Sequence, residues 1–183
     1  LDASGSATIN ATVQNSTFTS TRADFFQLNV VGNASSNLIF DNNTLSNSQT
    51  PVTGGGGITI GVGDNTGSAN LTFNINGNSI HGSDGNAFTI FKSTDPGILQ
   101  GTFSNNIIGL AATGSSGSLN GSGLKIQNAG LGTVTVRLSG NQIYQYNLYG
   151  IELITGGGAA AYGGNLNATV TGNTIANPGF NAL

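Results

Sequence analysis

The sequence contains no cysteine, no methionine and only three prolines, and just 6% of its residues are charged. An ordinary soluble domain has about 25% charged residues. Without cysteine, the chain has neither disulfides nor thiolate metal ligands. With no methionine and no signal peptide, we interpret it as a processed chain or a piece of a longer one. No apolar run approaches the roughly 18 residues of a transmembrane span, so we expect no membrane insertion.

Positive charge is also scarce, and the net charge is −3. The four basic residues are spread along the chain, at Arg22, Lys92, Lys125 and Arg137. A nucleic-acid-binding protein needs a basic stripe that neutralises phosphates. We therefore expect no nucleic-acid partner, and the same reasoning disfavours binding to anionic membranes.

What the sequence does contain is a repeated six-residue motif. Its first and last positions are apolar, its third position is Gly or Asn, its fourth is usually Asn, and the other two positions vary. Val13–Phe18 is the first copy and Val170–Ile175 is the last. The fourth position recurs every 27 to 35 residues, at Ser16, Asn43, Asn78, Asn106, Asn141 and Asn173. A period in this range is typical of a repeat architecture.

Two further patterns predict strands in every repeat. A longer alternation of apolar and other residues precedes the Asn motif, as in Leu71–Ile75 and Val134–Leu138. Elsewhere an apolar-x-apolar triplet recurs, preceded by a small residue in every copy except the first, at Phe26–Leu28, Ile58–Ile60, Phe88–Ile90, Leu124–Ile126 and Ile151–Leu153. Alternation with period two puts the apolar side chains on one face of a strand. No segment has a period of 3.6, so helices should be nearly absent.

These patterns predict an all-β protein in which about six coils stack as a parallel β-solenoid. Each coil would contain a short strand, a variable loop, a longer strand, a tight turn at the Asn and a second short strand. We expect residues 1–183 to form one solenoid domain that belongs to a longer chain. Coil length varies in rim loops at Ser46–Gly57, Gly61–Asn70, Ala111–Gly123 and Thr155–Asn165.

The asparagines of the motif predict a structural ladder. A sharp bend between strands needs a residue that tolerates positive φ, as Asn and Gly do. Stacked Asn side chains also hydrogen-bond from coil to coil. The expected ladder consists of Asn43, Asn78, Asn106, Asn141 and Asn173, and Ser16 would interrupt it in the first coil.

The segment Gly150–Ile175 resembles the repeat of right-handed parallel β-helices. Pectate lyases, polygalacturonases, phage tailspikes, autotransporter passengers and many bacterial surface proteins share this repeat. The resemblance implies a right-handed parallel β-helix over nearly the whole chain, and the sequence is most similar to the non-catalytic surface or fibre members. Fold alone does not determine function, because functional sites differ on the same scaffold.

The resemblance also implies where an enzyme would carry its active site. The family's lyases and hydrolases have clustered Asp residues, often with Arg, Lys or calcium, on one outward strand face. Here the outward column of the short strand reads Gln27, Thr59, Thr89, Lys125 and Glu152. Glycoside hydrolysis usually needs two carboxylates, and this column has one. We therefore assign no catalytic residue and no cofactor.

The strongest candidates for binding lie near the C-terminus. Lys125 and Glu152 occupy equivalent positions in successive coils, which predicts a surface ion pair. Tyr144, Tyr146 and Tyr149 surround one turn, and exposed rings there would form a patch for sugar stacking or protein contact. The alternative is that the rings cover the core, since tyrosine favours strands. A fourth tyrosine, Tyr162, follows nearby.

Other polar residues suggest no metal site. His81 has no neighbouring His or Cys, which indicates an exposed histidine. Asp64 and Asp84 lie in Gly-rich segments, and turn formation explains both better than calcium binding does.

Together, these observations predict a non-catalytic extracellular or cell-surface scaffold of a bacterial or phage protein, such as a stalk, adhesin or fibre. Its partners would be glycans or cell-surface molecules. The alternative is a polysaccharide-degrading enzyme or a carbohydrate-binding module that acts on the short-strand face. Neither end has a capping helix, so we expect end-to-end association or continuation into further coils, unless a tail with Phe180 folds across.

Overall fold

The computed structural model describes residues 1–48, 56–64, 66–156 and 163–179. Strands and their connections account for the whole of this part, which contains no helix. In particular, it has no helix long and apolar enough to cross a membrane. Tyr162 and Phe180 lie outside the described residues, as do parts of the predicted loops Ser46–Gly57, Gly61–Asn70 and Thr155–Asn165.

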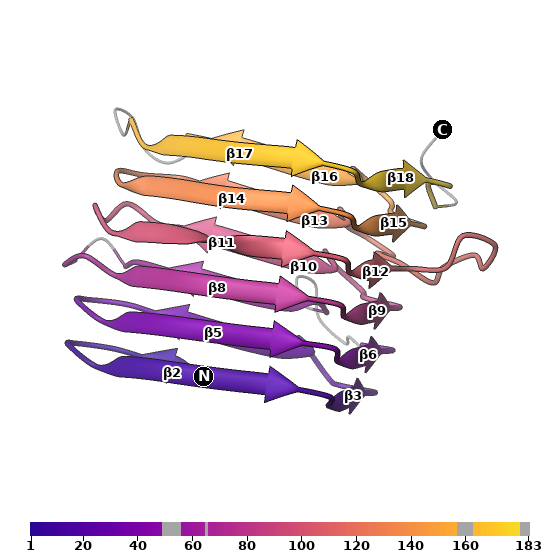
Figure 1. The fold of residues 1–183 in the computed structure, drawn as a ribbon, viewed down its shortest axis with the longest axis horizontal. Helices are drawn as coiled ribbons and strands as arrows, with labels where there is room; N and C mark the ends of the chain where they lie inside the picture. The colour runs from indigo at the N-terminus through magenta and orange to yellow at the C-terminus, as the bar shows by residue number, and fades with distance from the viewer. Residues whose placement is uncertain (49–55, 65, 157–162, 180–183) are drawn as a thin grey trace.

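The strands form three parallel sheets that run the length of the stack (Figure 1). Sheet A contains five-residue strands and a shorter first one: β1 (Asp2–Ala3), β4 (Phe26–Val30), β7 (Ile58–Val62), β10 (Phe88–Lys92), β13 (Leu124–Asn128) and β16 (Ile151–Thr155). Sheet B contains seven-residue strands: β2 (Thr8–Gln14), β5 (Ser35–Asp41), β8 (Asn70–Asn76), β11 (Ile98–Ser104), β14 (Thr133–Ser139) and β17 (Asn165–Thr171). Sheet C contains the shortest strands: β3 (Thr17–Thr19), β6 (Thr44–Ser46), β9 (Ser79–His81), β12 (Ile107–Ile108), β15 (Gln142–Tyr144) and β18 (Thr174–Ala176).

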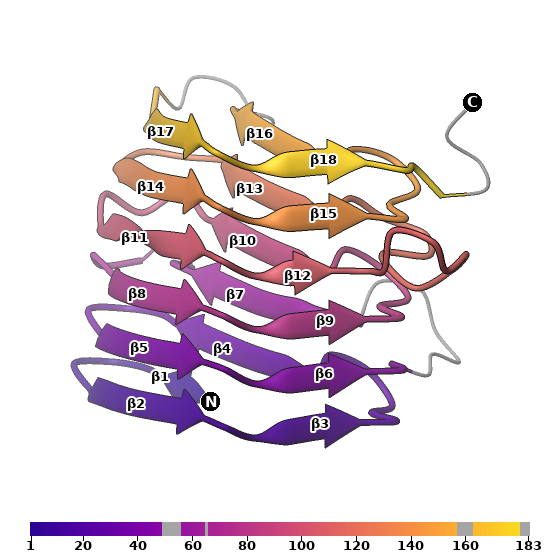
Figure 2. The ribbon, with the colours of Figure 1, turned by 45° about the vertical axis from the view of Figure 1, so that its right-hand side comes forward.

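The chain visits sheets A, B and C in turn, and each strand pairs with its equivalents in the neighbouring coils (Figure 2). The predicted outward column of sheet A is in register, since Gln27 pairs with Thr59, and Lys125 pairs with Glu152. The predicted fold class, an all-β parallel solenoid, is confirmed. The strands extend into the predicted loops: β7 continues through Gly61 to Val62, and strands also include the predicted loop ends Ser46, Asn70, Thr155 and Asn165.

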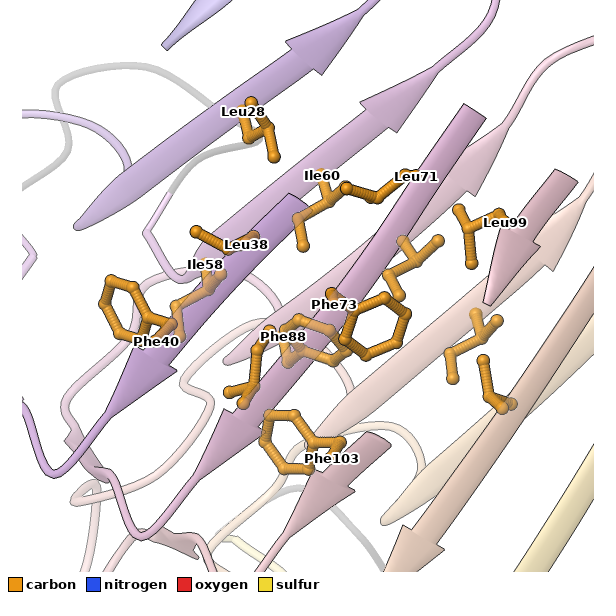
Figure 3. Packing of buried hydrophobic residues seen from close by; sticks show 14 of the residues in the cluster. Leu28, Leu38, Phe40, Ile58, Ile60, Leu71, Phe73, Phe88, Leu99 and Phe103 are labelled. Atoms are coloured by element: carbon orange, nitrogen blue, oxygen red, sulfur yellow. The ribbon is translucent and has the colours of Figure 1, made fainter. Parts of the chain in front are cut away.

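Apolar side chains from the three sheets fill the space inside the coils (Figure 3). Alternation along β8 and β14 buries every second residue, as the period-two pattern predicts. Aromatic rings meet in the middle of the core, where Phe88 on β10 and Phe103 on β11, two strands of one coil, stack with ring centroids 4.5 Å apart. The repeated strands of the three sheets together enclose one continuous hydrophobic core.

The corner between sheets B and C holds the asparagine ladder. Asn106 is fully buried, and its Nδ2 donates to Asn141 Oδ1 at 3.1 Å and to the Ile75 carbonyl at 3.0 Å. In return, its Oδ1 accepts from the backbone N–H of Asn78 at 2.8 Å. The same amide-to-amide bond links the other neighbouring pairs: Asn43 to Asn78, Asn78 to Asn106, and Asn141 to Asn173.

The conformational reason for the ladder differs from the sequence-based one. Positive φ falls on the residue before each ladder asparagine, as at Asn42 (55°) and Gly77 (68°), and not on the ladder residue itself. The ladder asparagine is required instead for its hydrogen bonds, which satisfy backbone groups that the corner leaves without strand partners. Ser16 keeps its place in the column, because its backbone N–H donates to Asn43 Oδ1 at 2.9 Å.

Candidate functional site

A pocket of about 360 Å³ opens where the outer face of sheet A meets the connections that arrive from sheet C. Its volume lies at the small end of the range for ligand sites, about 300–1,000 Å³. Three neighbouring coils contribute to its lining, which consists of Asp84, Gly85, Asn86, Asn120, Gly121, Lys125, Leu148 and Glu152. The connection that contributes Asn120 and Gly121 belongs to the long segment between β12 and β13, which projects from the stack in Figures 1 and 2.

Lys125 on β13 and Glu152 on β16 form one wall of this pocket. Parallel pairing places them side by side, and Lys125 Nζ lies 3.6 Å from Glu152 Oε1. Their side chains are 30% and 20% exposed, so the predicted ion pair is present but partly buried. The buried hydroxyl of Ser122 donates to Glu152 Oε2 at 2.9 Å and fixes the carboxylate from below.

A second carboxylate, Asp84, enters the pocket from the connection between β9 and β10. Asn120 fixes it twice: its Nδ2 donates to Asp84 Oδ1 at 3.1 Å, and its backbone N–H donates to the Asp84 carbonyl at 2.8 Å. From the other side, the Ser48 hydroxyl lies 2.9 Å from the Asp84 backbone nitrogen and accepts its hydrogen bond. From the sequence, turn formation explains Asp84 better than calcium binding does, and nothing local in the sequence placed it in one pocket with Glu152.

The floor of the pocket depends on a close approach of two backbones. A Cβ atom on Gly121 would lie 2.5 Å from the backbone nitrogen of Asn86, so no larger residue fits without displacement. The next residue, Ser122, donates its N–H to Asn86 Oδ1 at 2.7 Å. On the far side, the backbone N–H of Leu148 donates to the Gly121 carbonyl at 3.1 Å. Consecutive coils are therefore joined directly beneath the pocket.

The tyrosines take three different environments. Tyr144 is half-buried on sheet C, and its hydroxyl donates to Gln142 Oε1 at 3.1 Å. Tyr146 packs against the hydrophobic core. Of the three tyrosines that the structure describes, only Tyr149 is exposed, at 58%, next to the exposed Leu148. The structure therefore does not bring the three rings into one exposed patch, and none of them lines the pocket.

His81 lies at the end of β9, on the outer side of sheet C, with its Nε2 3.1 Å from the Ser79 hydroxyl. Partial burial lowers the pKa of His81 below its usual 6.5. In the connection after β7, the Thr66 hydroxyl donates to Asp64 and lowers the pKa of this carboxyl. Within the described residues, no three His, Asp or Glu side chains group together as metal ligands would.

A buried ion pair was missed by the sequence reasoning. The side chains of Lys92, at the end of β10, and Asp95 are both fully buried, and the Lys92 ammonium contacts the Asp95 carboxylate directly. The ammonium also donates to the Asp95 carbonyl at 2.7 Å, while the carboxylate accepts from the Gly97 N–H at 2.9 Å. A Cβ on Gly63 would lie 2.2 Å from Asp95 Oδ2, so glycine at this position makes room for the carboxylate.

The signal for this pair was present in the alternation of β10. Phe88 and Ile90 point inward, and period two continues to Lys92, which pairs in register with the buried Val62. A lysine at an inward position requires a buried acceptor, because an isolated buried charge is very costly. Asp95, three residues later, is the nearest acidic residue in the sequence.

Comparisons of this chain with protein-family models, with curated proteins and with solved structures find no match.

Proposed function

We propose that this chain is a non-catalytic segment of a large extracellular bacterial or phage protein, in which the solenoid acts as a stalk, adhesin or fibre. Under this proposal it is a distant member of the pectate-lyase-like β-helix superfamily. The observation that supports a scaffold role is the asparagine ladder, which repeats the same buried contacts from Asn43 to Asn173. Those contacts extend a rod coil by coil, and most of the inward-facing residues serve them or the core.

The cellular location is tested on intact cells or particles that carry the parent protein. Antibodies against residues 1–183 should label their surface, and external proteinase K should remove the label while a cytoplasmic marker protein survives. Labelling only after lysis would contradict the extracellular assignment.

Exposed apolar residues of the last described coil support the proposal of end-to-end contact. Val170 and Ile175 are 46% and 43% exposed, whereas their partners one coil earlier, Leu138 and Ile143, are fully buried. A further coil, from a longer chain or from another copy, would bury this apolar surface. Sedimentation of residues 1–183 should then show concentration-dependent association that Val170→Lys weakens. A chain that stays monomeric at high concentration would contradict self-stacking.

The second candidate function is carbohydrate binding or cleavage at the pocket on the short-strand face. The pocket favours it because Asp84 adds a second carboxylate to the one on sheet A. Both carboxylates are held in place by hydrogen bonds that they accept, from Asn120 and Ser122, and the Lys125 ammonium lies 3.6 Å from Glu152 Oε1. This fixed mixture of acceptors and a donor supports binding.

Binding and cleavage are separated by incubating the purified chain with soluble polysaccharides. We expect retention on a polysaccharide without release of reducing ends. Release that disappears in Glu152→Gln, and not in the matched Asp41→Asn outside the pocket, would instead support a hydrolase. Absence of both retention and release would contradict this second function and leave the scaffold proposal intact.

A further inference from the structure

The pocket offers both donors and acceptors that the protein does not use. In the part of the chain that the structure describes, Lys125 Nζ has no hydrogen bond, because its distance to Glu152 is that of an ion pair only. The Nδ2 group of Asn86 is also free there, since only its Oδ1 is engaged, by Ser122. Asp84 accepts through one carboxylate oxygen and leaves the other available. A ligand with adjacent hydroxyl groups, each of which can both donate and accept a hydrogen bond, would pair with these free donors and acceptors.

The charge of the pocket is negative. Two carboxylates, Asp84 and Glu152, face one ammonium, that of Lys125, and the described lining carries no other charged residue. The resulting net charge of −1 repels an anionic ligand and attracts a cationic one, and partial burial weakens screening by salt. The pocket is therefore unsuited to a uronate.

The rim adds an apolar surface. Leu148 lines the pocket and is 56% exposed. The backbone bond from Leu148 to Gly121 fixes this position. A flat sugar ring presents C–H groups on one face and hydroxyls around its edge, so Leu148 and the polar lining suit the two parts of a single pyranose.

We propose that this pocket binds a single neutral or amino-bearing pyranose unit of a glycan and rejects the corresponding uronate. The proposal rests on the second candidate function and specifies its ligand. Asp84 and Glu152 accept hydroxyl or ammonium donors, Lys125 and Asn86 donate to ring hydroxyls, and Leu148 packs against the ring. The hydrogen bonds that hold Asp84, Glu152 and Gly121 in place reduce the ordering cost of binding.

The test compares sugars that share one pyranose ring and carry a neutral, an amino or a carboxylate substituent. Methyl glucoside, glucosamine and glucuronate, with their galacto counterparts, are titrated against the intact chain and followed by saturation-transfer NMR at low salt. The wild type should bind the neutral and amino forms of one series at least about tenfold more tightly than the uronate. Preference for the uronate would overturn this inference while glycan binding stands; binding of no sugar would overturn both and leave the scaffold role untouched.

Charge-swapped variants show whether the named residues carry the preference. Asp84→Asn/Glu152→Gln changes the pocket charge to +1 and should shift the preference towards the uronate. The matched double variant Asp2→Asn/Asp41→Asn makes the same change outside the pocket and should keep the wild-type order. If the first variant fails to fold, Lys125→Met gives a second measurement and should weaken uronate binding further. An unchanged order in the folded double variant Asp84→Asn/Glu152→Gln, or an unchanged uronate affinity in Lys125→Met, would overturn the proposal.

Discussion

The corner between sheets B and C and the ends of the sheet A strands are built in different ways. At the B–C corner, each ladder asparagine repeats the contacts of the one before it, as Asn78 and Asn106 do. At the ends of the sheet A strands, individual contacts occur once and are not repeated from coil to coil, as with the Lys92–Asp95 pair. Repetition holds the stack together, and irregularity supplies the charged groups that a binding site needs.

We expect the largest loss of stability when the Lys92–Asp95 ion pair, which occurs in one coil, is disrupted. Lys92→Met leaves the Asp95 carboxylate buried without its counter-charge, and removing one partner of a buried pair costs about 3–5 kcal/mol. Urea denaturation should show that the free energy of unfolding falls by this amount. The double variant Lys92→Met/Asp95→Asn should lose less than the single variant, because no buried charge remains. A single-variant loss below about 1 kcal/mol would show that the pair is solvated or dispensable.

The next largest loss of stability is expected when one residue of the repeated asparagine ladder is replaced. Asn106→Leu removes the acceptor of the Asn78 N–H and the donor to the Ile75 carbonyl, and buried groups left unpaired cost about 1–3 kcal/mol each. We expect the free energy of unfolding to fall by about 2–3 kcal/mol.

The matched control for this change is Asn105→Gly. Asn105 has a φ of 55°, and the equivalent Gly77 and Gly140 show that glycine suits this position. The change should stay within about 0.5 kcal/mol. Equal losses in the two variants would contradict the claim that the ladder amide, and not the turn, stabilises this corner.

A smaller change in stability, this time a gain, is expected when the buried serine in the core is replaced. The Ser36 hydroxyl is buried, and its Oγ has no hydrogen-bond partner. In register, Ser36 lies between Ile9 and Leu71, so an aliphatic residue fits the column. Ser36→Val should raise the free energy of unfolding by about 1 kcal/mol, because it removes an unpaired polar group and buries methyl groups. The control Ser35→Val, on the outer side of the strand, should not raise the free energy of unfolding. If Ser36→Val instead lowers the denaturation midpoint, the space around Ser36 is too small for valine.

The smallest effect concerns pH. Burial lowers the pKa of His81 in the folded state, so below pH 6.5 the unfolded chain binds more protons than the folded one. Stability from this residue is therefore complete above pH 6.5 and declines as the pH falls towards the folded pKa. His81→Gln should flatten the decline measured by thermal unfolding between pH 7 and 5. An equally steep decline in the variant would assign the effect to another group.

Sequence periodicity predicted the repeated features well. Alternation and the recurring Asn motif identified the strands, the parallel stacking and the ladder positions, because each repeat supplied the same information again. Lys125 and Glu152 were paired for the same reason, since register follows from the repeat.

The irregular features were harder to predict. Asp84 reaches the pocket through a connection whose course no periodic pattern determines, and Gly121 is needed for a contact with a loop of the preceding coil. The tyrosines were grouped because they are close in sequence, but alternation and the turn send Tyr144 and Tyr146 to different surroundings. Proximity along the chain is a poor guide at a corner, where neighbouring residues point in different directions.

The asparagine ladder also gives the molecule a direction. At every step the amide of the earlier coil donates and the Oδ1 of the later coil accepts, from Asn43 to Asn173. The side-chain dipoles therefore align and polarise one another along the axis. The two ends of the row are chemically unlike: an added coil after Asn173 must offer an acceptor, whereas Ser16 at the other end has no side-chain amide. Copies joined along such an axis would follow one another head to tail, a geometry that extends into filaments and does not close into symmetric pairs.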